Sequence, residues 1–325
     1  MDRLYFGLLI LLLLSFSSSH AATETVNLLS WWGYVDKNSA KAIESKCNIK
    51  FSVDEYYSNS EFLRRWDNKR NSHDLVIYSN TIHGFVQPLI NKRQSSKIKK
   101  VKYPEPFGSQ VSKLHLPNTT RVFLISLTGF LWNSKKFNLS SEMAISEIFK
   151  LVNGKNILIL DDSVEGMDFV TKVQNASIKL ESLPSNFFIA NDKTNLISSP
   201  DFGFAYMWSG SAFEHMTENK ELKFIVHPQL THLTADLISV VSDSRGAKCA
   251  FDHLSSEKFL TELQGKTYFF SPFGKLDSRE SKFGEFYKLH INSIGNSDWL
   301  KVPGREAFVG LLNEWKKVKL RLRKK

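Results

Sequence analysis

The sequence contains none of the short motifs that usually mark an enzyme active site. It has no glycine-rich phosphate loop and no cluster of residues at metal-ligand spacing. It also has no nucleophile elbow, because the Trp-Ser-Gly-Ser segment at 208–211 lacks the required spacing. His227 and His232 lie five positions apart and are interpreted as structural residues. These absences predict a protein that is not an enzyme and that carries no cofactor.

Long apolar runs are also scarce, and one of them lies at the N-terminus of the sequence. Arg3 precedes the apolar run 4–14, and the small-residue stretch 15–22 follows it. This order is typical of a secretory signal, with cleavage expected after Ala21 or Ala22. The run is shorter than the roughly 20 residues that span a bilayer, although an uncleaved N-terminal anchor is the alternative. With no cysteine near the cleavage point and no later apolar span, we expect a soluble periplasmic protein.

Cysteine is nearly absent, since the chain contains only Cys47 and Cys249. An oxidising compartment permits a disulfide between them. Such a bond requires Cα atoms within about 7 Å, which the sequence does not fix. A disulfide and two buried free thiols are therefore both open.

Negative charge is in deficit, and the formal net charge is +10. Seven of the last ten positions are basic: Lys316, Lys317, Lys319, Arg321, Arg323, Lys324 and Lys325. Such a run suits the solvated C-terminal end of a helix, where cations complement the macrodipole. It could also dock on acidic lipid or an acidic partner. The export signal argues against nucleic acid as the partner.

What remains is a long, apolar-rich chain with alternating elements. The roughly 300 residues after the signal exceed what one core usually accommodates, so two lobes are expected. The sequence predicts strands at 26–30, 50–53 and 74–77, with helices at 37–47 and after the Ser-Asn-Ser-Glu start at 58–61. This alternation predicts an α/β lobe with a largely parallel sheet.

The second half continues the pattern. The apolar segment 122–132 is expected to make the first crossing to a second lobe near 126–129. Further strands are predicted at 155–160, 202–208 and 237–241, and the last helices at 281–291 and 304–321. Aromatic and acidic residues recur where strands end, and in open α/β sheets ligands bind at those ends. We therefore expect several of these residues to meet in one cleft.

Six segments and two later landmarks resemble those of bacterial periplasmic spermidine/putrescine-binding proteins. The segments are Ser30-Trp31-Trp32-Gly33-Tyr34-Val35, Tyr57-Ser58-Asn59-Ser60-Glu61, Asp74-Leu75-Val76 leading to Ser79, Thr128-Gly129-Phe130-Leu131-Trp132-Asn133, Leu160-Asp161-Asp162-Ser163-Val164-Glu165 and Met207-Trp208-Ser209-Gly210-Ser211-Ala212-Phe213. Asp236 and an aromatic before Pro272 follow in the same order. The resemblance covers nearly the whole chain after the signal.

The resemblance implies an α/β, two-lobed, type II periplasmic binding fold. One lobe is expected to comprise 23–125 plus 232–275, and the other 126–231 plus 276–325. Each lobe would be a mostly parallel sheet flanked by helices, and the lobes would close on a ligand held between them.

The resemblance also implies which residues meet the ligand. Polyamine ammonium groups only donate hydrogen bonds, so a receptor needs carboxylates separated by apolar walls. Asp162 and Glu165 are expected to hold a terminal amine and Asp236 another. The remaining expected contacts are the aromatic walls Trp31, Tyr34 and Trp208, the polar Ser79 and Ser211, and Phe269, for which Tyr268 is the alternative.

Other residues near these positions are interpreted more simply. Asp161 is expected behind the site, and Trp32 and Trp66 in packing roles. Glu165 has an alternative role as the cap of the following helix.

Three positions depart from the family pattern. Thr234 stands in place of a tryptophan, Gly33 in place of an acid and Thr81 in place of a tyrosine. The pocket is therefore expected to be less aromatic and less acidic, and the preferred polyamine stays open.

Two kinds of partner fit these expectations. The first is an inner-membrane ABC permease, to which a monomeric receptor would deliver putrescine or spermidine. The alternative is a membrane signalling protein on which a polyamine-sensing subunit would dock. A further alternative is the same fold holding another small cation, although ferric iron on the adjacent Tyr56 and Tyr57 fits poorly beside a helix cap.

Overall fold

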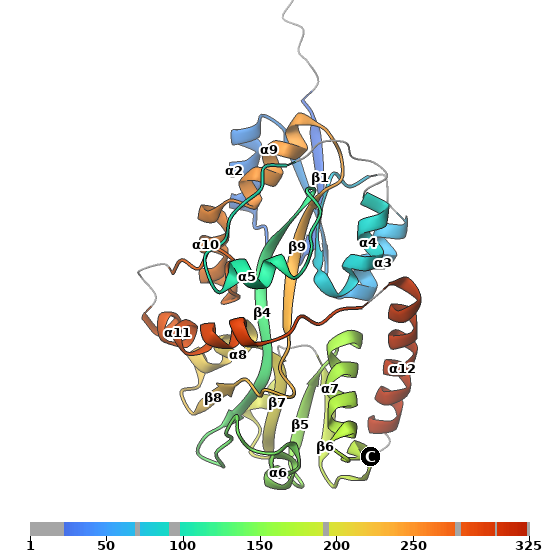
Figure 1. Ribbon diagram of the computed structural model, residues 1–325, viewed down its shortest axis with the longest axis vertical. Coiled ribbons are helices and arrows are strands. Elements are labelled where there is room, and N and C mark those ends of the chain that lie inside the picture. The colour runs from blue at the N-terminus through green and yellow to red at the C-terminus, as the bar shows by residue number, and fades with distance from the viewer. Residues whose placement is uncertain are drawn as a thin grey trace, which may run out of the picture.

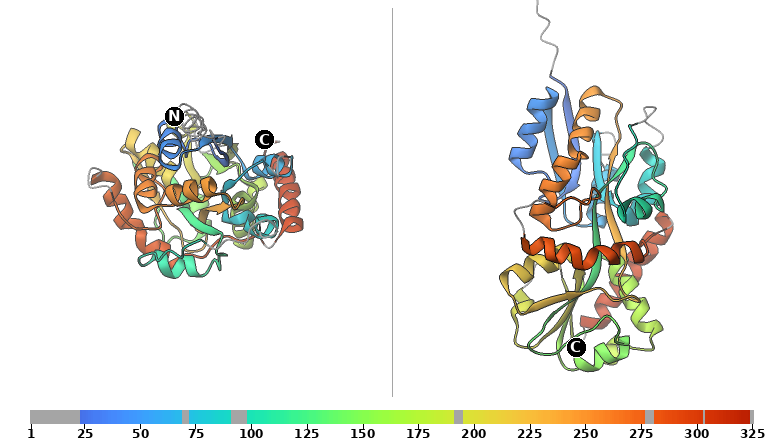
Figure 2. Two further views of the ribbon diagram at one scale, coloured as in Figure 1. Left: turned by 90° about the horizontal axis from the view of Figure 1, so that it is seen from above. Right: turned by 60° about the vertical axis from the view of Figure 1, so that its left-hand side comes forward.

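The computed structural model describes residues 23–68, 72–90, 98–190, 195–276, 281–302 and 304–323. The expected signal segment and the last two basic residues lie outside the described residues. The described chain forms an elongated molecule of two stacked halves (Figures 1 and 2). No described helix is long and apolar enough to cross a membrane.

The upper half in Figure 1 is built around three parallel strands, β1 (Thr25–Trp31), β2 (Lys50–Tyr56) and β3 (Leu75–Ser79). Its helices are α2 (Lys37–Cys47), α3 (Asn59–Asn68), η1 (Asn80–Ile82), α4 (His83–Ile90), α5 (Phe107–Ser112), α9 (Arg245–Leu254) and α10 (Glu257–Thr267). β2 extends beyond the predicted 50–53, because it pairs with β1 along its whole length. The carboxyl ends of these strands therefore reach the same edge of the sheet.

The lower half contains β5 (Asn156–Leu160), β6 (Asn186–Ala190), β7 (Phe202–Trp208) and β8 (Leu222–Ile225). Its helices are α6 (Ile145–Leu151), α7 (Ser163–Asn175), η2 (Leu180–Ser182), η3 (Asn195–Ser198) and α8 (Ser209–Glu218). β5 pairs in parallel with both β6 and β7, so the carboxyl ends of β5 and β7 also lie together. This edge faces the upper half.

Two strands run through both halves, β4 (Thr120–Asn133) and β9 (Leu233–Val240). β4 pairs with β9 up to Leu127 and with β7 from Thr128 onward. All but the last of its 14 residues are buried, which accounts for the long apolar run in the sequence. The strand order is β2-β1-β3-β9-β4-β7-β5-β6, with β8 paired to β4.

β9 begins earlier than the sequence predicts. A start at position 237 was wrong, because Thr234 and Ala235 pair with Ser126 and Ile125 of β4. Asp236 therefore lies inside a strand, opposite Ser79 of β3.

The last two helices take different paths. α12 (Arg305–Arg323) returns to the lower half, where it packs on α7 and β6. α11 (Ser281–Asn296) lies across the level where the halves meet (Figure 2). Tyr287 of α11 contacts Phe107 of α5, whereas Phe286 contacts Phe213 of α8. The segment after residue 276 is thus not confined to the lower half.

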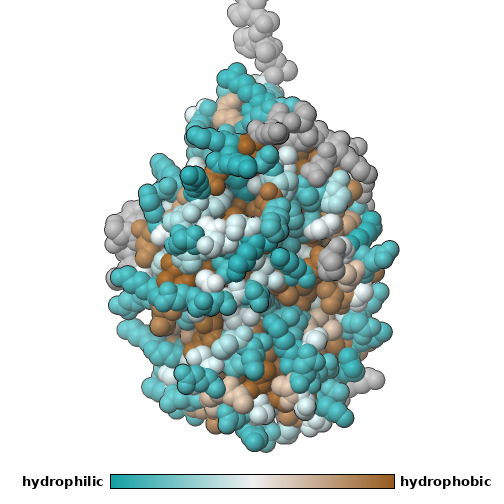
Figure 3. All heavy atoms as spheres, viewed as in Figure 1, coloured by the Kyte–Doolittle hydropathy of each residue, from teal (hydrophilic) through white to brown (hydrophobic). Residues whose placement is uncertain are grey.

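Cys47 and Cys249 form a disulfide between α2 and α9, with Cα atoms 5.7 Å apart. Of the two states that the sequence left open, the structure has the bonded one. Trp66 is fully buried in the upper half, as expected for a packing residue. On the face shown in Figure 3, apolar areas are interspersed among polar side chains, with no single apolar surface dominating it.

Candidate functional site

A cavity of about 480 Å³ lies between the two halves. From above it is lined by the segments that follow β1, β2 and β3, and from below by those that follow β5 and β7. β4 and β9 form its back wall. All nine residues expected at the site line this one cavity: Trp31, Tyr34, Ser79, Asp162, Glu165, Trp208, Ser211, Asp236 and Phe269.

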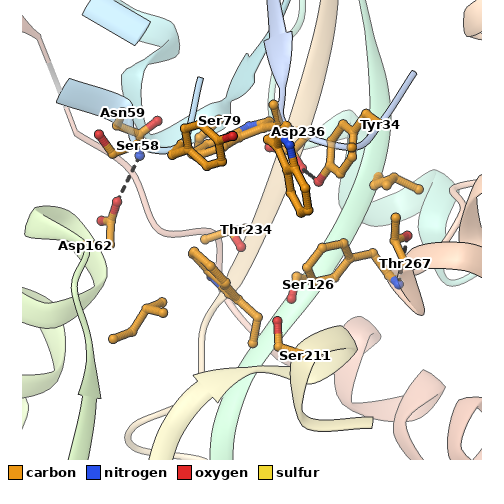
Figure 4. A pocket seen from close by; sticks show the side chains of 18 of the residues that line it. Tyr34, Ser58, Asn59, Ser79, Ser126, Asp162, Ser211, Thr234, Asp236 and Thr267 are labelled. Carbon is orange, nitrogen blue, oxygen red and sulfur yellow. Dashed lines mark hydrogen bonds between the residues drawn. The ribbon is translucent and has the colours of Figure 1, made fainter. Parts of the chain in front are cut away.

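Asp162 is the N-cap of α7. Its Oδ1 accepts hydrogen bonds from the backbone N–H groups of Val164 (2.8 Å) and Glu165 (3.1 Å). Its Oδ2 accepts from Asn59 Nδ2 at 3.1 Å, a bond that crosses the cavity from the upper half (Figure 4). Burial raises the pKa of Asp162, while these hydrogen bonds oppose the shift. The alternative role of Glu165 as the helix cap is therefore wrong.

Glu165 lies one turn into α7 and is 3% exposed. Burial and the neighbouring Asp162 carboxylate raise its pKa well above the usual range, and Asp236 adds to the effect. The Trp208 side chain opposes it through a hydrogen bond. Glu165 Oε2 has no hydrogen-bond partner in the described structure. This oxygen is a buried acceptor that a donor in the cavity could satisfy.

Asp236 faces the cavity from β9. Its Oδ2 accepts a hydrogen bond from the Tyr34 hydroxyl at 2.5 Å, which Figure 4 shows at the top of the cavity. Burial raises its pKa to about 6, although Tyr34 and the Trp31 indole lower it. The Asp236 carboxylate thus points into the cavity from a central strand and accepts its hydrogen bond from a side chain, not from the backbone.

No described Lys, Arg or His makes an ion pair or hydrogen bond with these three carboxylates. Lys266 lines the cavity, but its Nζ lies 2.8 Å from Asp36. Asp161, expected behind the site, lines the cavity, but its Oδ1 accepts hydrogen bonds from Trp315 Nε1 (2.8 Å) and Lys319 Nζ (2.9 Å) of α12. One residue of the basic C-terminal run is therefore engaged inside the molecule.

The aromatic walls come from both halves. The Trp31 ring lies 4.5 Å from that of Tyr56 in the upper half, and Trp208 is the last residue of β7 in the lower half. Phe269 covers Gly210 so closely that a Cβ there would lie 2.6 Å from its ring. Tyr268 instead packs against Phe213 at 4.8 Å, so Phe269 is the residue that reaches the cavity.

The two serines differ in their surroundings. Ser79 Oγ lies 2.9 Å from Thr81 Oγ1 and also accepts from Thr81 N, so it caps the short η1 helix. Ser211 lies in the first turn of α8 and reaches the cavity from below (Figure 4).

Trp32 was assigned to packing, and this was wrong. Its residue surface is 51% exposed, and its ring stacks on that of Tyr57, 5.8 Å away, at the cavity wall. The sequence reasoning also missed Asn59, whose position at the start of α3 was visible only as a helix-start signal. Further unexpected lining residues are Ser58, Ser126, Glu214, Lys266 and Thr267.

A metal centre finds little support in these contacts. The described residues contain no group of three or more His, Cys, Asp or Glu that could hold a metal ion. The Tyr56 hydroxyl donates a hydrogen bond to the Ile77 carbonyl at 2.7 Å, so it is engaged inside the core.

No family model and no curated protein sequence matches this chain. Solved structures, in contrast, align with most of the chain. The spermidine/putrescine ABC transporter substrate-binding protein PotD of Streptococcus pneumoniae aligns with a TM-score of 0.68 and 13% identity, over 93% of this chain and 99% of PotD. The Tp0655 (TpPotD) lipoprotein of Treponema pallidum aligns with a TM-score of 0.60 and 16% identity, over 83% and 99%.

Iron-bound HitA of Pseudomonas aeruginosa also aligns, with a TM-score of 0.56 and 15% identity, over 91% of this chain and 99% of HitA. The chain has the type II periplasmic binding fold, as predicted. Because these identities are low and the neighbours differ in their ligands, the likeness establishes the fold and leaves the ligand to the chemistry of the cavity.

Proposed function

We propose that this protein is a periplasmic polyamine-binding receptor of the putrescine/spermidine class, which closes on its ligand and delivers it to an ABC-type permease. One observation supports this most strongly: the buried carboxylates of Asp162 and Glu165 and the half-buried carboxylate of Asp236 share a cavity and have no cationic partner in the described structure.

The energetics of burial explain why this arrangement calls for a cation. A buried charge is costly unless it is paired and hydrogen-bonded. An ammonium group supplies both the opposite charge and three donors. Two buried acceptors at the cavity, Glu165 Oε2 and Asn59 Oδ1, have no hydrogen-bond partner among the described residues. Charge-assisted bonds to such acceptors contribute about 1.5–3 kcal/mol each.

The walls between the carboxylates suit the carbon chain of a polyamine. Trp31, Trp208 and Phe269 present aromatic surface to the cavity, on which methylene groups can pack. Aromatic faces also attract cations by roughly 0.5–2 kcal/mol, depending on how far water is excluded. The volume of about 480 Å³ lies in the ordinary range for small-molecule pockets.

The placement of the cavity supports delivery by lobe closure. Carboxylates from both halves face the same space, so a ligand that touches all of them favours the state in which the halves are together. The likeness to an ABC transporter substrate-binding protein supports a permease as the partner that reads this closed state.

Isothermal titration calorimetry with putrescine, spermidine, norspermidine and spermine tests the proposal. At least one of them should bind with a dissociation constant in the micromolar range at pH 8. The matched control ligand is 5-aminopentanoate, which keeps the four methylene groups of putrescine and replaces one ammonium with a carboxylate. It should not bind, because that carboxylate would meet Asp162, Glu165 and Asp236. Absence of binding by every polyamine at millimolar concentration would overturn the proposal.

A second candidate is a polyamine-sensing subunit that docks on a membrane signalling protein. It is favoured by the exposed basic side chains near the end of α12, which include Lys316, Lys317 and Arg321. Deletion of the gene distinguishes the two: loss of polyamine uptake supports transport, whereas intact uptake with a lost polyamine response supports sensing.

A further inference from the structure

Two exposed aromatic residues stand at the end of the cavity wall formed by β1 and β2. Trp32 is 51% exposed and Tyr57 is 61% exposed. Their rings stack with centroids 5.8 Å apart and planes inclined by 26°. The Trp32 N–H donates to the Tyr56 carbonyl at 3.0 Å, which holds the two strand ends in register. This backbone hydrogen bond therefore holds Trp32 and Tyr57 next to each other.

The pair continues an aromatic layer deeper in the cavity. Trp31 and Tyr56, the last residues of β1 and β2, form a deeper pair whose ring centroids lie 4.5 Å apart, with Tyr56 fully buried and Trp31 half-buried. Consecutive Cα atoms are about 3.8 Å apart. The outer pair thus lies one residue further along both strands, and all four residues line the cavity.

A carboxylate accompanies the outer pair. Glu55 Oε1 accepts a hydrogen bond from the Gly33 N–H at 2.9 Å. Gly33 has a φ of +78°, a left-handed conformation that favours glycine and turns the chain directly after Trp32. No described cationic side chain pairs with Glu55, so its negative charge is uncompensated in the described structure.

The opposite end of the cavity is less suited to a cation. Thr267 lies on the opposite side of the cavity from Ser58 and Asn59 (Figure 4), and its neighbour in the chain, Lys266, also lines the cavity. The ammonium of Lys266 is paired with Asp36 at 2.8 Å, so the Asp36 carboxylate already has a cationic partner. A further ammonium of a ligand is therefore expected to extend away from Lys266.

We propose that Trp32, Tyr57 and Glu55 form an outer subsite for an additional ammonium-bearing segment of the ligand, so that this protein prefers triamines to diamines. This inference depends on the polyamine-binding function proposed above and specifies the length of its ligand. The inner carboxylates hold one end of the chain, and the outer aromatic faces and Glu55 hold the other.

Calorimetry on Trp32→Ala and Glu55→Gln, with putrescine and spermidine, tests this directly. In the native protein spermidine should bind at least tenfold more tightly than putrescine. Each substitution should weaken spermidine binding by about twofold to fivefold, as expected for one exposed cation–π or ion contact, and leave putrescine binding unchanged. Phe188→Ala is the matched control, because Phe188 is 40% exposed on β6 and does not line the cavity.

Tryptophan quenching gives a second measurement that does not depend on the alanine variant. Of the seven tryptophans, all within the described residues, Trp32 alone has more than half of its surface exposed. Spermidine should protect the fluorescence from acrylamide more than putrescine does at equal saturation. The difference should vanish in Trp32→Phe.

The possible outcomes distinguish a failure of the outer subsite from a failure of the proposed polyamine-binding function. If both amines bind and both lose affinity equally, or if neither substitution has an effect, the outer subsite is wrong and the polyamine function stands. If the two amines protect Trp32 equally, the outer subsite is likewise wrong. If no amine binds at all, both proposals fall.

Discussion

Of the carboxylates of Asp162, Glu165 and Asp236, that of Glu165 has the least favourable electrostatic surroundings. It is buried, its Oε2 has no hydrogen-bond partner in the described structure, and Asp162 and Asp236 both raise its pKa. A group in this position destabilises the protein alone and stabilises a complex with a cation. Binding and stability should therefore respond to its charge in opposite directions.

Replacing Glu165 with glutamine keeps the shape and removes the charge. We expect Glu165→Gln to raise the melting temperature by several degrees, because relief of an uncompensated buried charge is worth about 1–3 kcal/mol. The same change should weaken polyamine binding by about tenfold to a hundredfold. Differential scanning calorimetry and titration calorimetry measure the two effects. Glu142→Gln, at an exposed position before α6, should change neither. A lower melting temperature in Glu165→Gln would contradict this account.

The destabilising charge of Asp236 should make the stability of the unliganded protein depend on pH. Its pKa rises from 3.8 to about 6 in the folded protein because of burial. The folded state therefore holds this proton more tightly than the unfolded state, so the contribution of Asp236 to stability is largest below pH 4 and is lost as pH rises through 6. That shift corresponds to roughly 3 kcal/mol above pH 6.

We expect Asp236→Asn to match the native protein in stability at pH 4 and to exceed it at pH 7. Asparagine retains an oxygen that can accept from the Tyr34 hydroxyl, so the comparison isolates the charge. Thermal melts at the two pH values measure the difference. An equal gap at pH 4 and pH 7 would show that the charge of Asp236 is not its cause.

Among the secondary-structure elements, local signals located most boundaries. The helix that starts near 58–61 and the third strand were predicted because a cap signal and an apolar run mark them. β9 was cut short because Thr234 and Asp236 are polar, and polar residues resemble a loop in sequence. They lie in a strand here because the cavity takes up their side chains.

Contacts between distant elements were beyond the sequence. The prediction placed Trp32 in a packing role because sequence does not show which of two adjacent tryptophans faces outward. The pairing of β1 with β2 decides it, since Trp31 lies opposite the buried Tyr56. The pairing of Lys319 with Asp161 likewise depends on α12 returning beside α7.

The contacts of α11 with distant elements were likewise not predicted from the sequence. The sequence resemblance assigned its segment to the second lobe, and its aromatic residues contact both halves. Phe286 lies 4.9 Å from Phe213 below, and Tyr287 lies 6.5 Å from Phe107 above, by ring centroids. A helix that packs on both halves can follow either one when they move.

At the scale of the whole molecule, the contacts between the halves determine how far the cavity is closed. Besides the two continuous strands and α11, the upper half reaches the lower through Phe269 on Gly210 and through the Asn59–Asp162 hydrogen bond. Asn59 and Asp162 both line the cavity, so this bond lies beside the ligand position. It is the contact best placed to bias the protein toward the closed state before a ligand arrives.

Removing this bond should open the unliganded molecule. A hydrogen bond to a charged group contributes about 1.5–3 kcal/mol, enough to change the ratio of open to closed molecules by about tenfold or more. We expect Asn59→Ala to show a larger radius of gyration than the native protein in small-angle X-ray scattering without ligand. Saturating spermidine should restore the native value, because the ligand then bridges the halves. Asn38→Ala, at an exposed position on α2, is the matched control. If Asn59→Ala and the native protein scatter identically without ligand, closure must depend on the other contacts between the halves, which include the hinge strands, α11 and Phe269 on Gly210.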